Sequence, residues 1–466
     1  MNPKIIKILV VIGGLIIVWF GAFLLRGNFT SSQPQAVLEF WNVFDKSDDI
    51  KPLLKKFTQD TGIRVNYRSF TDLQEYRDTL LLELAAGEGP DVFAIHQNWI
   101  PKYRSLLTPL PSTDLGFFVE NVHQDFVDVV ASSVILKEEI PESDREKGRE
   151  ANEGIFALPM YLDTLAFYFN KSIFRNVLSK PYPAPALTWE GVYDDTVKLS
   201  VADSDDPEGF KLSGIALGRA DNILRGVDIF YTFYHQLGGE DLTNATKENQ
   251  RDSNGKAYQP LAFALEFITS FSRNPKIKGY SWNSKISADA PEKEIDAFVR
   301  GKVAMMAGYS YTFETIKSLI TQYKKRGVSG VVQVADVEIA PFPQVSSPQE
   351  GNPKTSLADF FALTVAKTSR HPHASWQLIL ELTNQDSQKR YHELTGKPTS
   401  RRDLIEEQKK DPLFGVFAEQ AVYADTLLIF DDKKYAALIS DAINSIADGT
   451  ESVSNVAKKL ATDLQD

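Results

Sequence analysis

The chain has 466 residues, a formal net charge of −11 and no cysteine. This length allows two or three domains with a large core. The acidic balance argues against a nucleic-acid backbone as partner, because phosphate binding needs clustered Lys and Arg. Without cysteine the chain has no disulfide, thiol nucleophile, cysteine-ligated zinc or lipidated cysteine.

The amino-terminal segment 5–25 is almost wholly apolar, with Lys7 as its single charge. About 20 such residues span a hydrocarbon core of ~30 Å as a helix. The segment ends in Phe23-Leu24-Leu25-Arg26, which lacks the small residues of a signal-peptide cleavage site. We therefore expect residues 1–35 to be an uncleaved transmembrane anchor with a short tether, which holds the body outside the cytoplasm at the cell membrane.

Strand and helix patterns alternate after the tether. The periodicity predicts strands over 36–41, 63–70 and 92–95, and helices over 49–61 and 71–86. This order is typical of a parallel sheet with right-handed crossovers. Ligands of such sheets bind beyond the carboxyl ends of the strands, where 41–45 and 96–99 fall.

The stretch 158–174 marks a change in the chain. Its apolar run 165–169 is stopped by Asn170-Lys171, and its weak alternation indicates a strand covered on both faces. A helix is expected to begin at Ser172. We interpret this strand as the point where the chain leaves a first lobe and enters a second.

The remaining pattern predicts further elements of an α/β protein. The predicted helices cover 117–136, 228–237, 260–272, 292–300, 374–383 and most of 433–464, and another begins at Thr188-Trp189 with Thr188 as its N-cap. The predicted strands cover 214–218, 303–307, 337–339 and 358–365.

Four segments in this order resemble the extracellular solute-binding protein family that includes maltose-binding protein. They are Phe40-Trp41 with Gly62-Ile63-Arg64-Val65, then Ala85-Ala86-Gly87-Glu88-Gly89-Pro90-Asp91-Val92-Phe93, then Leu158-Pro159 through Asp163 and Tyr168 to Thr188-Trp189, and finally Ala297-Phe298 through Gly301-Lys302-Val303-Ala304-Met305 and Gly308 to Ala340-Pro341-Phe342-Pro343. The match extends over nearly all of 36–466. It is specific for the family but not for the ligand.

The resemblance implies a type II periplasmic-binding-protein-like fold of two α/β lobes joined at a hinge. Lobe 1 is expected to comprise 36–156 and 340–397, and lobe 2 to comprise 157–339 and 398–466. The crossings between lobes are expected near 157–159, 338–341 and 396–400. The resemblance implies that the lobes close on a solute and pass it to an ABC-type permease, and we expect the chain to be a monomer. Gram-positive members usually carry a lipidated cysteine, and here the amino-terminal helix would replace it.

Candidate ligand-binding residues lie at the expected strand ends and crossings. Sugar sites stack aromatic rings on sugar faces and fix hydroxyls with polar side chains. The resemblance places ligand contacts at Trp41 and Asp45, although Trp41 could instead pack in the core. His96 and Gln97 follow the third strand, and a loop histidine is the alternative reading. Tyr161 and Asp163 adjoin the first crossing, where Asp163 could instead cap the backbone.

Three further positions complete the predicted site. Tyr309 and Tyr311 follow Gly308, where the resemblance implies an aromatic platform, with core packing as the alternative. Phe360, next to Asp359, lies in the strand over 358–365. Trp189 is also included, although packing is the competing reading for it and for Tyr231.

Motifs for metals, cofactors and catalysis are weak. His371-Pro372-His373 precedes a helix and is better read as a cap than as a metal site. The acidic loop 203–209 lacks the spacing and the closing Glu of a calcium loop. We find no nucleotide-binding glycine motif and no G-x-S-x-G. We therefore expect no cofactor, no metal and no enzymatic activity.

The sequence thus predicts a membrane-anchored receptor that captures a sugar or oligosaccharide for an ABC transporter. Two alternatives stay open. One is a membrane-anchored carbohydrate-active enzyme, which requires two carboxylates at glycosidase spacing in one cleft. The other is a ligand sensor that feeds a signalling partner.

Overall fold

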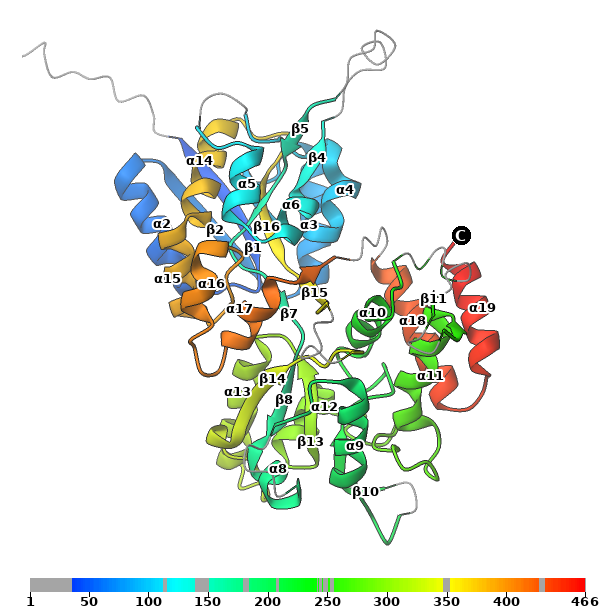
Figure 1. Cartoon of the computed structure of the whole chain (residues 1–466). Helices are drawn as coiled ribbons and strands as arrows, with labels where there is room; N and C mark the ends of the chain where they lie inside the picture. Colours follow the sequence, from blue (N-terminus) through cyan, green and yellow to red (C-terminus); the bar gives the residue numbers. More distant parts are fainter. Residues whose placement is uncertain are drawn as a thin grey trace, which may run out of the picture.

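A computed structural model describes residues 36–465 except 112–114, 139–150, 179–183, 207–208, 241, 243–244, 246–249, 252–254, 347–352 and 427–431. Two five-stranded sheets, each flanked by helices, form two lobes (Figure 1). The predicted anchor at 1–35 lies outside the described residues. Within the described part, none of the helices has the length and apolar character needed to span a membrane.

The sheet of lobe 1 has the strand order β2-β1-β3-β16-β6. Its strands are β1 Val37–Val43, β2 Arg64–Phe70, β3 Val92–His96, β6 Leu158–Pro159 and β16 Phe361–Val365. β1 is parallel to β2 and β3, as predicted, whereas β16 returns antiparallel to β3 and β6. The carboxyl ends of β1 and β3 therefore meet at the same edge.

The helices of lobe 1 are α2 Ser47–Thr61, α3 Leu73–Ala86, α5 Val119–Asp125, α6 Asp128–Val134, α14 Pro372–Thr383, α15 Gln385–Thr395 and α16 Arg402–Gln408. Two of these helices, α3 and α15, have side-chain N-caps and end at a left-handed glycine. The Asp72 side chain accepts a hydrogen bond of 2.7 Å from the Glu75 N–H and caps α3. Gly87 ends α3 in the left-handed conformation, with φ 76°. The predictions for α2 and α3 are confirmed.

The sheet of lobe 2 has the strand order β14-β8-β13-β10-β9. Its strands are β8 Ala166–Asn170, β9 Val201–Ala202, β10 Phe210–Ile215, β13 Val303–Gly308 and β14 Val337–Pro341. Every residue of β8 is buried, as the poor alternation of this stretch predicted. β10 and β13 are parallel, so their carboxyl ends also share an edge.

The helices of lobe 2 are α8 Lys171–Leu178, α9 Trp189–Leu199, α10 Gly226–Gln236, α11 Pro260–Arg273, α12 Lys293–Val299, α13 Thr312–Lys325, α18 Asp432–Ala447 and α19 Val453–Asp463. The Thr188 hydroxyl accepts a hydrogen bond from the Gly191 N–H, which confirms Thr188 as the N-cap of α9. In Figure 1, α18 and α19 return the carboxyl end of the chain to this lobe.

The prediction of one helix over 117–136 is wrong. Phe126 and Val127 are buried in extended backbone between α5 and α6, and Phe126 forms an isolated β-bridge with Arg401. After α6 the chain forms β4 (Ile135–Lys137), which pairs with β5 (Glu153–Ile155). Burying these two apolar side chains in extended backbone stabilises the segment more than a continuous helix over 117–136 would.

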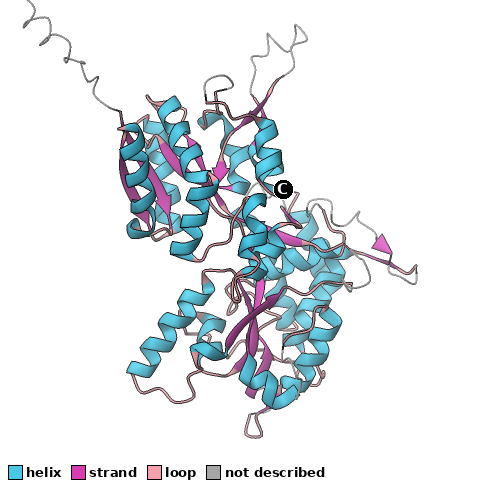
Figure 2. Cartoon of the chain, turned by 60° about the vertical axis from the view of Figure 1, so that its left-hand side comes forward, coloured by secondary structure: helices cyan, strands magenta, loops and turns pink. Residues whose placement is uncertain are grey.

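A small sheet forms the waist between the lobes. It has the order β17-β15-β7, with β7 Asp163–Thr164, β15 Ser356–Asp359 and β17 Ala424–Asp425. The sequence placed the crossings near 157–159, 338–341 and 396–400. In the structure the hydrophobic core changes between 162 and 165, between 342 and 358, and after 424, while α17 (Gly415–Ala421) contributes to both cores. Figure 2 shows the narrowing between the two helix-flanked sheets.

Gln420 of α17 forms hydrogen bonds with two segments next to the waist, one at the end of β7 and one just after β14. Its fully buried amide donates to the Thr164 hydroxyl and the Leu165 carbonyl, each at 2.8 Å, and accepts from the Phe342 N–H at 2.8 Å. A satisfied buried amide of this kind fixes local geometry, since leaving its partners unpaired is costly. The waist therefore has a defined structure and is more than a flexible linker.

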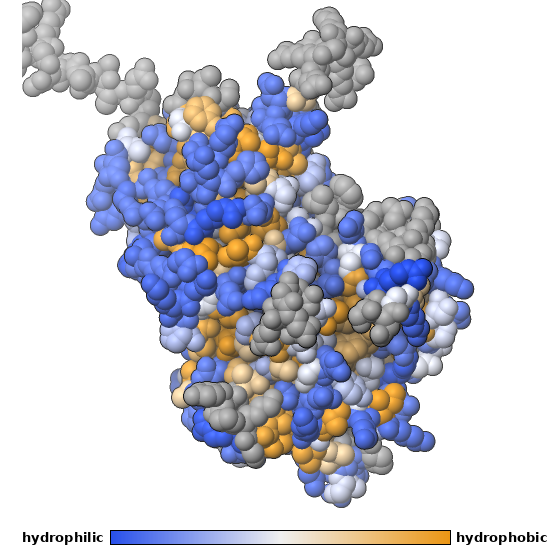
Figure 3. Space-filling model, in the orientation of Figure 1, coloured by the Kyte–Doolittle hydropathy of each residue, from blue (hydrophilic) through white to orange (hydrophobic). Residues whose placement is uncertain are grey.

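Buried hydrophobic residues form two separate cores, one for each lobe. Trp376 and Tyr76 are fully buried in the first core, and Trp282 and Tyr234 in the second. Polar side chains cover most of the face in Figure 3, where hydrophobic residues show as separate patches. Each lobe therefore has the separate hydrophobic core that is typical of a domain.

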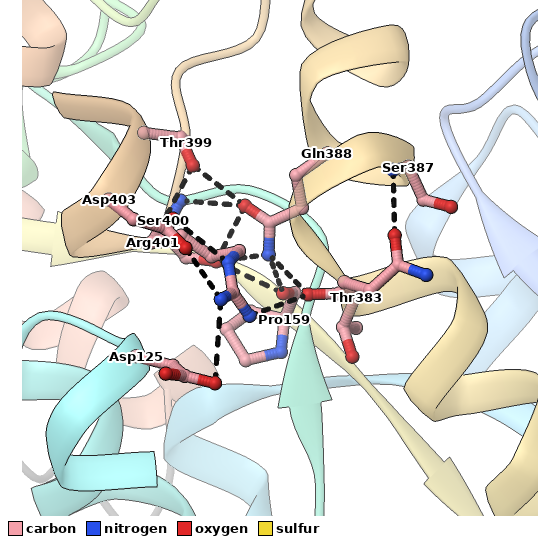
Figure 4. A network of polar contacts seen from close by, with 10 residues as sticks. Asp125, Pro159, Thr383, Ser387, Gln388, Thr399, Ser400, Arg401 and Asp403 are labelled. Carbon is pink, nitrogen blue, oxygen red and sulfur yellow. Dashed lines mark hydrogen bonds and ion pairs between the residues drawn. The ribbon is translucent and has the colours of Figure 1, made fainter. Parts of the chain in front are cut away.

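A polar network fixes the segment that follows α15 (Figure 4). The buried Gln388 amide donates to the Pro159 carbonyl at 3.0 Å and accepts from the Thr399 hydroxyl at 2.8 Å. Arg401 donates to Asp403 at 2.7 Å and its Nη2 lies 3.4 Å from Asp125 Oδ2. The segment 396–401 is thus held against β6 and α5, next to the waist.

Candidate functional site

A cavity of about 960 Å³ lies between the lobes and is lined by residues from both lobes and the waist. This volume is near the upper end of the ~300–1,000 Å³ range of small-molecule sites. Of the predicted site residues, the lining contains His96, Gln97, Tyr161, Asp163, Tyr309 and Tyr311, whereas Trp41, Asp45, Trp189 and Phe360 are outside it.

Aromatic rings form the wall on lobe 1. Phe361 begins β16, and its ring centroid lies 5.2 Å from His96, 6.0 Å from Trp99 and 6.0 Å from Phe44. Phe44 is held at φ 70° in the turn after β1, and half of its side chain is exposed. These rings offer apolar faces beside polar groups, as a sugar ring requires.

His96 and Asp359 form a polar pair on this wall. His96 Nε2 lies 2.8 Å from Asp359 Oδ1, so β3 of lobe 1 contacts β15 of the waist. Burial acts to raise the pKa of Asp359, but the hydrogen bond and charge of His96, together with Arg225, outweigh it and hold the pKa below its ordinary value. Asp359 is therefore ionised at neutral pH.

Arg225 organises the wall on lobe 2. Its guanidinium carbon lies 5.1 Å from the ring centroid of Tyr309 and 5.5 Å from that of Tyr311, and the guanidinium donates to the Tyr311 hydroxyl. The two tyrosine rings stack with centroids 5.9 Å apart. Arg225 Nη1 also lies 3.4 Å from Asp228 Oδ2. Burial raises the pKa of Asp228, against the opposing charge of Arg225.

Asp163 joins the waist to this platform. Its carboxylate accepts from the Ser310 hydroxyl at 2.6 Å, from the Ser310 N–H at 3.0 Å and from the Thr164 N–H at 2.9 Å. Burial raises the pKa of Asp163 to about 7, although these hydrogen bonds favour the charged form. Asp163 thus lines the cavity and also fixes the backbone between Tyr309 and Tyr311, and its contact with a ligand stays a prediction.

Asp163 gives a pH prediction. Because its folded pKa lies above the ordinary value of 3.8, the folded state binds the extra proton between about pH 4 and pH 7. Its contribution to stability is therefore greatest at low pH and is lost as pH rises through about 7. We expect Asp163→Asn to flatten the fall in melting temperature between pH 5 and pH 8, measured by circular dichroism. Equal slopes for the variant and the wild type would show that Asp163 does not titrate in this range.

Gln97 lines the cavity and also fixes the backbone beside it. Its amide donates to the Ala358 carbonyl at 2.5 Å and accepts from the Phe360 N–H at 2.7 Å. This fixes the chain between β15 and β16. The predicted single strand over 358–365 is wrong, because Phe360 separates these two strands and its ring is fully buried. Its neighbours Asp359 and Phe361 line the cavity instead.

Three other predicted residues lie outside the lining. Trp41 packs against Phe70 in the core of lobe 1, with ring centroids 5.5 Å apart. Trp189 packs in the aromatic core of lobe 2, and its indole donates to Gln236 at 2.9 Å. Asp45 lies behind the wall and accepts from Lys397 Nζ, a lining residue, at 2.6 Å.

Sequence reasoning missed several lining residues, notably Phe44, Arg225, Phe361 and Lys397. One available signal was the rule that ligands of α/β sheets bind beyond the carboxyl ends of parallel strands, which we call the strand-end rule. Arg225 lies in the connection between β10 and α10, at the same sheet edge as Tyr309. Tyr231 also lines the cavity. Within the described residues, no group of three or more His, Asp or Glu is arranged to hold a metal ion.

A family model described as bacterial extracellular solute-binding protein matches residues 53–416. The chain belongs to this family. The resemblance inferred from the sequence is therefore confirmed, and so is the prediction of a binding protein instead of an enzyme. A search of curated protein sequences gave no match.

Solved structures similar to this solute-binding protein share its fold. The sugar-binding protein MalE of Xanthomonas citri has a TM-score of 0.69 at 16% identity, over 92% of this chain and 96% of MalE. The GacH receptor of Streptomyces glaucescens has a TM-score of 0.66 at 17% identity, over 92% and 97%. A cyclo/maltodextrin-binding protein has a TM-score of 0.65 at 16% identity, over 93% and 98%. The two-lobe fold is thereby confirmed.

Proposed function

We propose that this solute-binding protein captures a sugar or oligosaccharide outside the cytoplasm and delivers it to an ABC-type permease. The observation that carries the proposal is the cavity, in which aromatic walls from both lobes face charged and polar groups. Sugars present apolar ring faces and a periphery of hydroxyls, and this combination suits both kinds of group.

The charges around the cavity favour an uncharged ligand. Arg225 is paired with Asp228, and His96 with Asp359, so each pair can donate and accept hydrogen bonds while keeping little net charge. A carboxylate or ammonium on the ligand would have to compete with these pairs. A hydroxyl can instead donate to the carboxylate and accept from the cation of one pair.

The position of the cavity at the waist connects binding to closure. Trp99 and Phe361 belong to lobe 1, and Tyr309 and Tyr311 to lobe 2. A ligand that contacts both walls favours the arrangement in which the lobes are closest, since it gains the second set of contacts only there. A permease could distinguish loaded from empty protein by this arrangement.

The known ligands of similar proteins agree with this choice. The cyclo/maltodextrin-binding protein was solved with maltotetraose, the GacH receptor with acarbose and CpMnBP1 with mannotriose. We further propose that residues 1–35 anchor the protein as a monomer in the cell membrane, which would keep it close to its permease.

Tryptophan fluorescence tests the proposal. Trp99 lines the cavity, so a bound sugar should change its emission. We expect a saturable change on titration with at least one of maltotriose, maltotetraose and mannotriose, and a rise in melting temperature with the same sugar. Trp99→Phe should lose much of the optical signal while calorimetry still detects binding. If no sugar in the panel changes either fluorescence or melting temperature, the proposal fails.

A further inference from the structure

Lys397 reaches the cavity from the segment after α15. Gly396 ends α15 with φ 70°, and the Lys397 side chain then lines the cavity with 13% of its surface exposed. Its ammonium lies 4.2 Å from the ring centroid of Tyr161, which also lines the cavity. This lysine is therefore a cation held at the wall of lobe 1, close to the waist.

Two of the three ammonium N–H groups are occupied by protein atoms. Nζ lies 2.6 Å from Asp45 Oδ1 and 3.0 Å from the Tyr391 hydroxyl oxygen. The Tyr391 hydroxyl in turn donates to Asp45, with 2.8 Å to each carboxylate oxygen. Because a lysine ammonium has three donors, the third is left for the face of the Tyr161 ring or for an acceptor in the cavity.

Asp45 balances the charge of this ammonium from outside the cavity. Only 5% of its side chain is exposed, and its Oδ2 also accepts from the Asn42 amide at 2.9 Å. The donor that remains on Lys397 therefore belongs to a compensated ion pair. Such a donor suits the lone pair of a neutral oxygen, since an anionic group would also approach the Asp45 carboxylate.

The backbone around Lys397 is fixed before any ligand arrives. Gln388 and Ser400 tie the following residues to the Pro159 carbonyl, as Figure 4 shows. A side chain held at both its backbone and its tip loses little conformational entropy when a ligand binds. The network is thus a support for the lysine as well as part of the lobe.

We propose that Lys397 is a ligand-binding residue that donates a hydrogen bond to a hydroxyl or ring oxygen of the sugar, with Asp45 and Tyr391 as its positioning residues. The proposal rests on the proposed function of the cavity. It also gives Asp45, predicted from the sequence as a ligand contact, a different role, in which it acts through Lys397.

Calorimetry of Lys397→Gln tests the proposal with maltotriose, maltotetraose and mannotriose. Loss of a hydrogen bond from a charged donor should weaken the binding of the recognised sugar roughly 10-fold to 100-fold. Lys171→Gln is the matched control, because Lys171 forms a 2.8 Å ion pair with Glu338 in lobe 2 and is not in the cavity lining. A dissociation constant for Lys397→Gln within twofold of the wild type overturns the proposal.

A double-mutant cycle tests the role of Asp45. If Asp45 acts through Lys397, Asp45→Asn alone weakens binding, but the double variant Asp45→Asn/Lys397→Gln binds no more weakly than Lys397→Gln. Fully additive losses would overturn the positioning role. Tyr391→Phe, which keeps the buried ring, is the second variant if substitution at Asp45 or Lys397 prevents folding, and it should weaken binding severalfold. An unchanged affinity for Tyr391→Phe would then count against the proposal.

The outcome for the wild type separates this inference from the proposed function. If the wild type binds none of the three sugars, the proposed function fails and the role of Lys397 fails with it. If the wild type binds a sugar and Lys397→Gln binds it equally well, only the inference about Lys397 is overturned.

Discussion

Replacing Arg225 with Met should weaken sugar binding about 100-fold or more. The guanidinium contacts Tyr309 and Tyr311 and forms an ion pair with Asp228, so its removal disturbs the whole wall of lobe 2. Loss of a hydrogen bond from a charged donor costs about 1.5–3 kcal/mol and loss of a cation–π contact about 0.5–2 kcal/mol, which together correspond to roughly 100-fold in affinity. Calorimetric titration of the recognised sugar measures the loss.

Arg273→Met is the matched control for this variant. Arg273 forms an ion pair of 2.5 Å with Glu266 on α11 of the same lobe, and it is not among the lining residues. It should leave the dissociation constant unchanged. If the two variants bind the sugar equally well, Arg225 has no part in recognition, and the wall of lobe 2 has been misassigned.

Trp189→Ala should lower the free energy of unfolding by about 3–5 kcal/mol, as is usual for truncation of a buried Trp. The indole packs edge-on against Phe233 and Phe342, with ring centroids 5.1 and 5.2 Å apart, and its N–H bonds to Gln236. Truncation leaves a cavity in the core of lobe 2 and removes the donor to the Gln236 amide oxygen. Urea unfolding of the variant and the wild type gives the difference.

Sugar affinity distinguishes the two readings of Trp189. The tryptophan is outside the cavity lining, so the folded variant should bind the recognised sugar as tightly as the wild type. Normal stability with weakened binding would be the opposite result. That result would support the prediction from the sequence that Trp189 contacts the ligand.

The strand-end rule predicted part of the site from the sequence. It pointed to His96, which ends a strand with a clear apolar pattern, whereas Tyr309 and Tyr311 were predicted from the family resemblance at the end of another such strand. It missed Arg225 because the preceding strand was predicted over 214–218, whereas β10 is Phe210–Ile215 and a ten-residue connection follows. Only the packing of this connection against Tyr309 brings the arginine into the cavity.

The residue type alone does not decide whether an aromatic side chain packs in a core or lines the cavity. Trp41 and Trp189 pack in cores, while Phe44 and Phe361 line the cavity. All four are large apolar side chains, so whether each lies in a core or in the cavity depends on the direction in which it leaves the backbone. The mainly apolar segment 358–365 gave no sign of the break between β15 and β16 at Phe360, and the prediction selected this buried residue instead of its neighbours.

The distance between the lobes tests the central claim most directly. Leu82 on α3 and Phe263 on α11 are exposed residues of lobe 1 and lobe 2, and the chain has no cysteine to compete for a label. Spin labels on Leu82→Cys/Phe263→Cys report this distance by pulsed electron paramagnetic resonance. We predict that a saturating amount of the recognised sugar shortens the distance and narrows its distribution. An unchanged distribution, with calorimetry showing the site occupied, would contradict binding by closure of the two lobes.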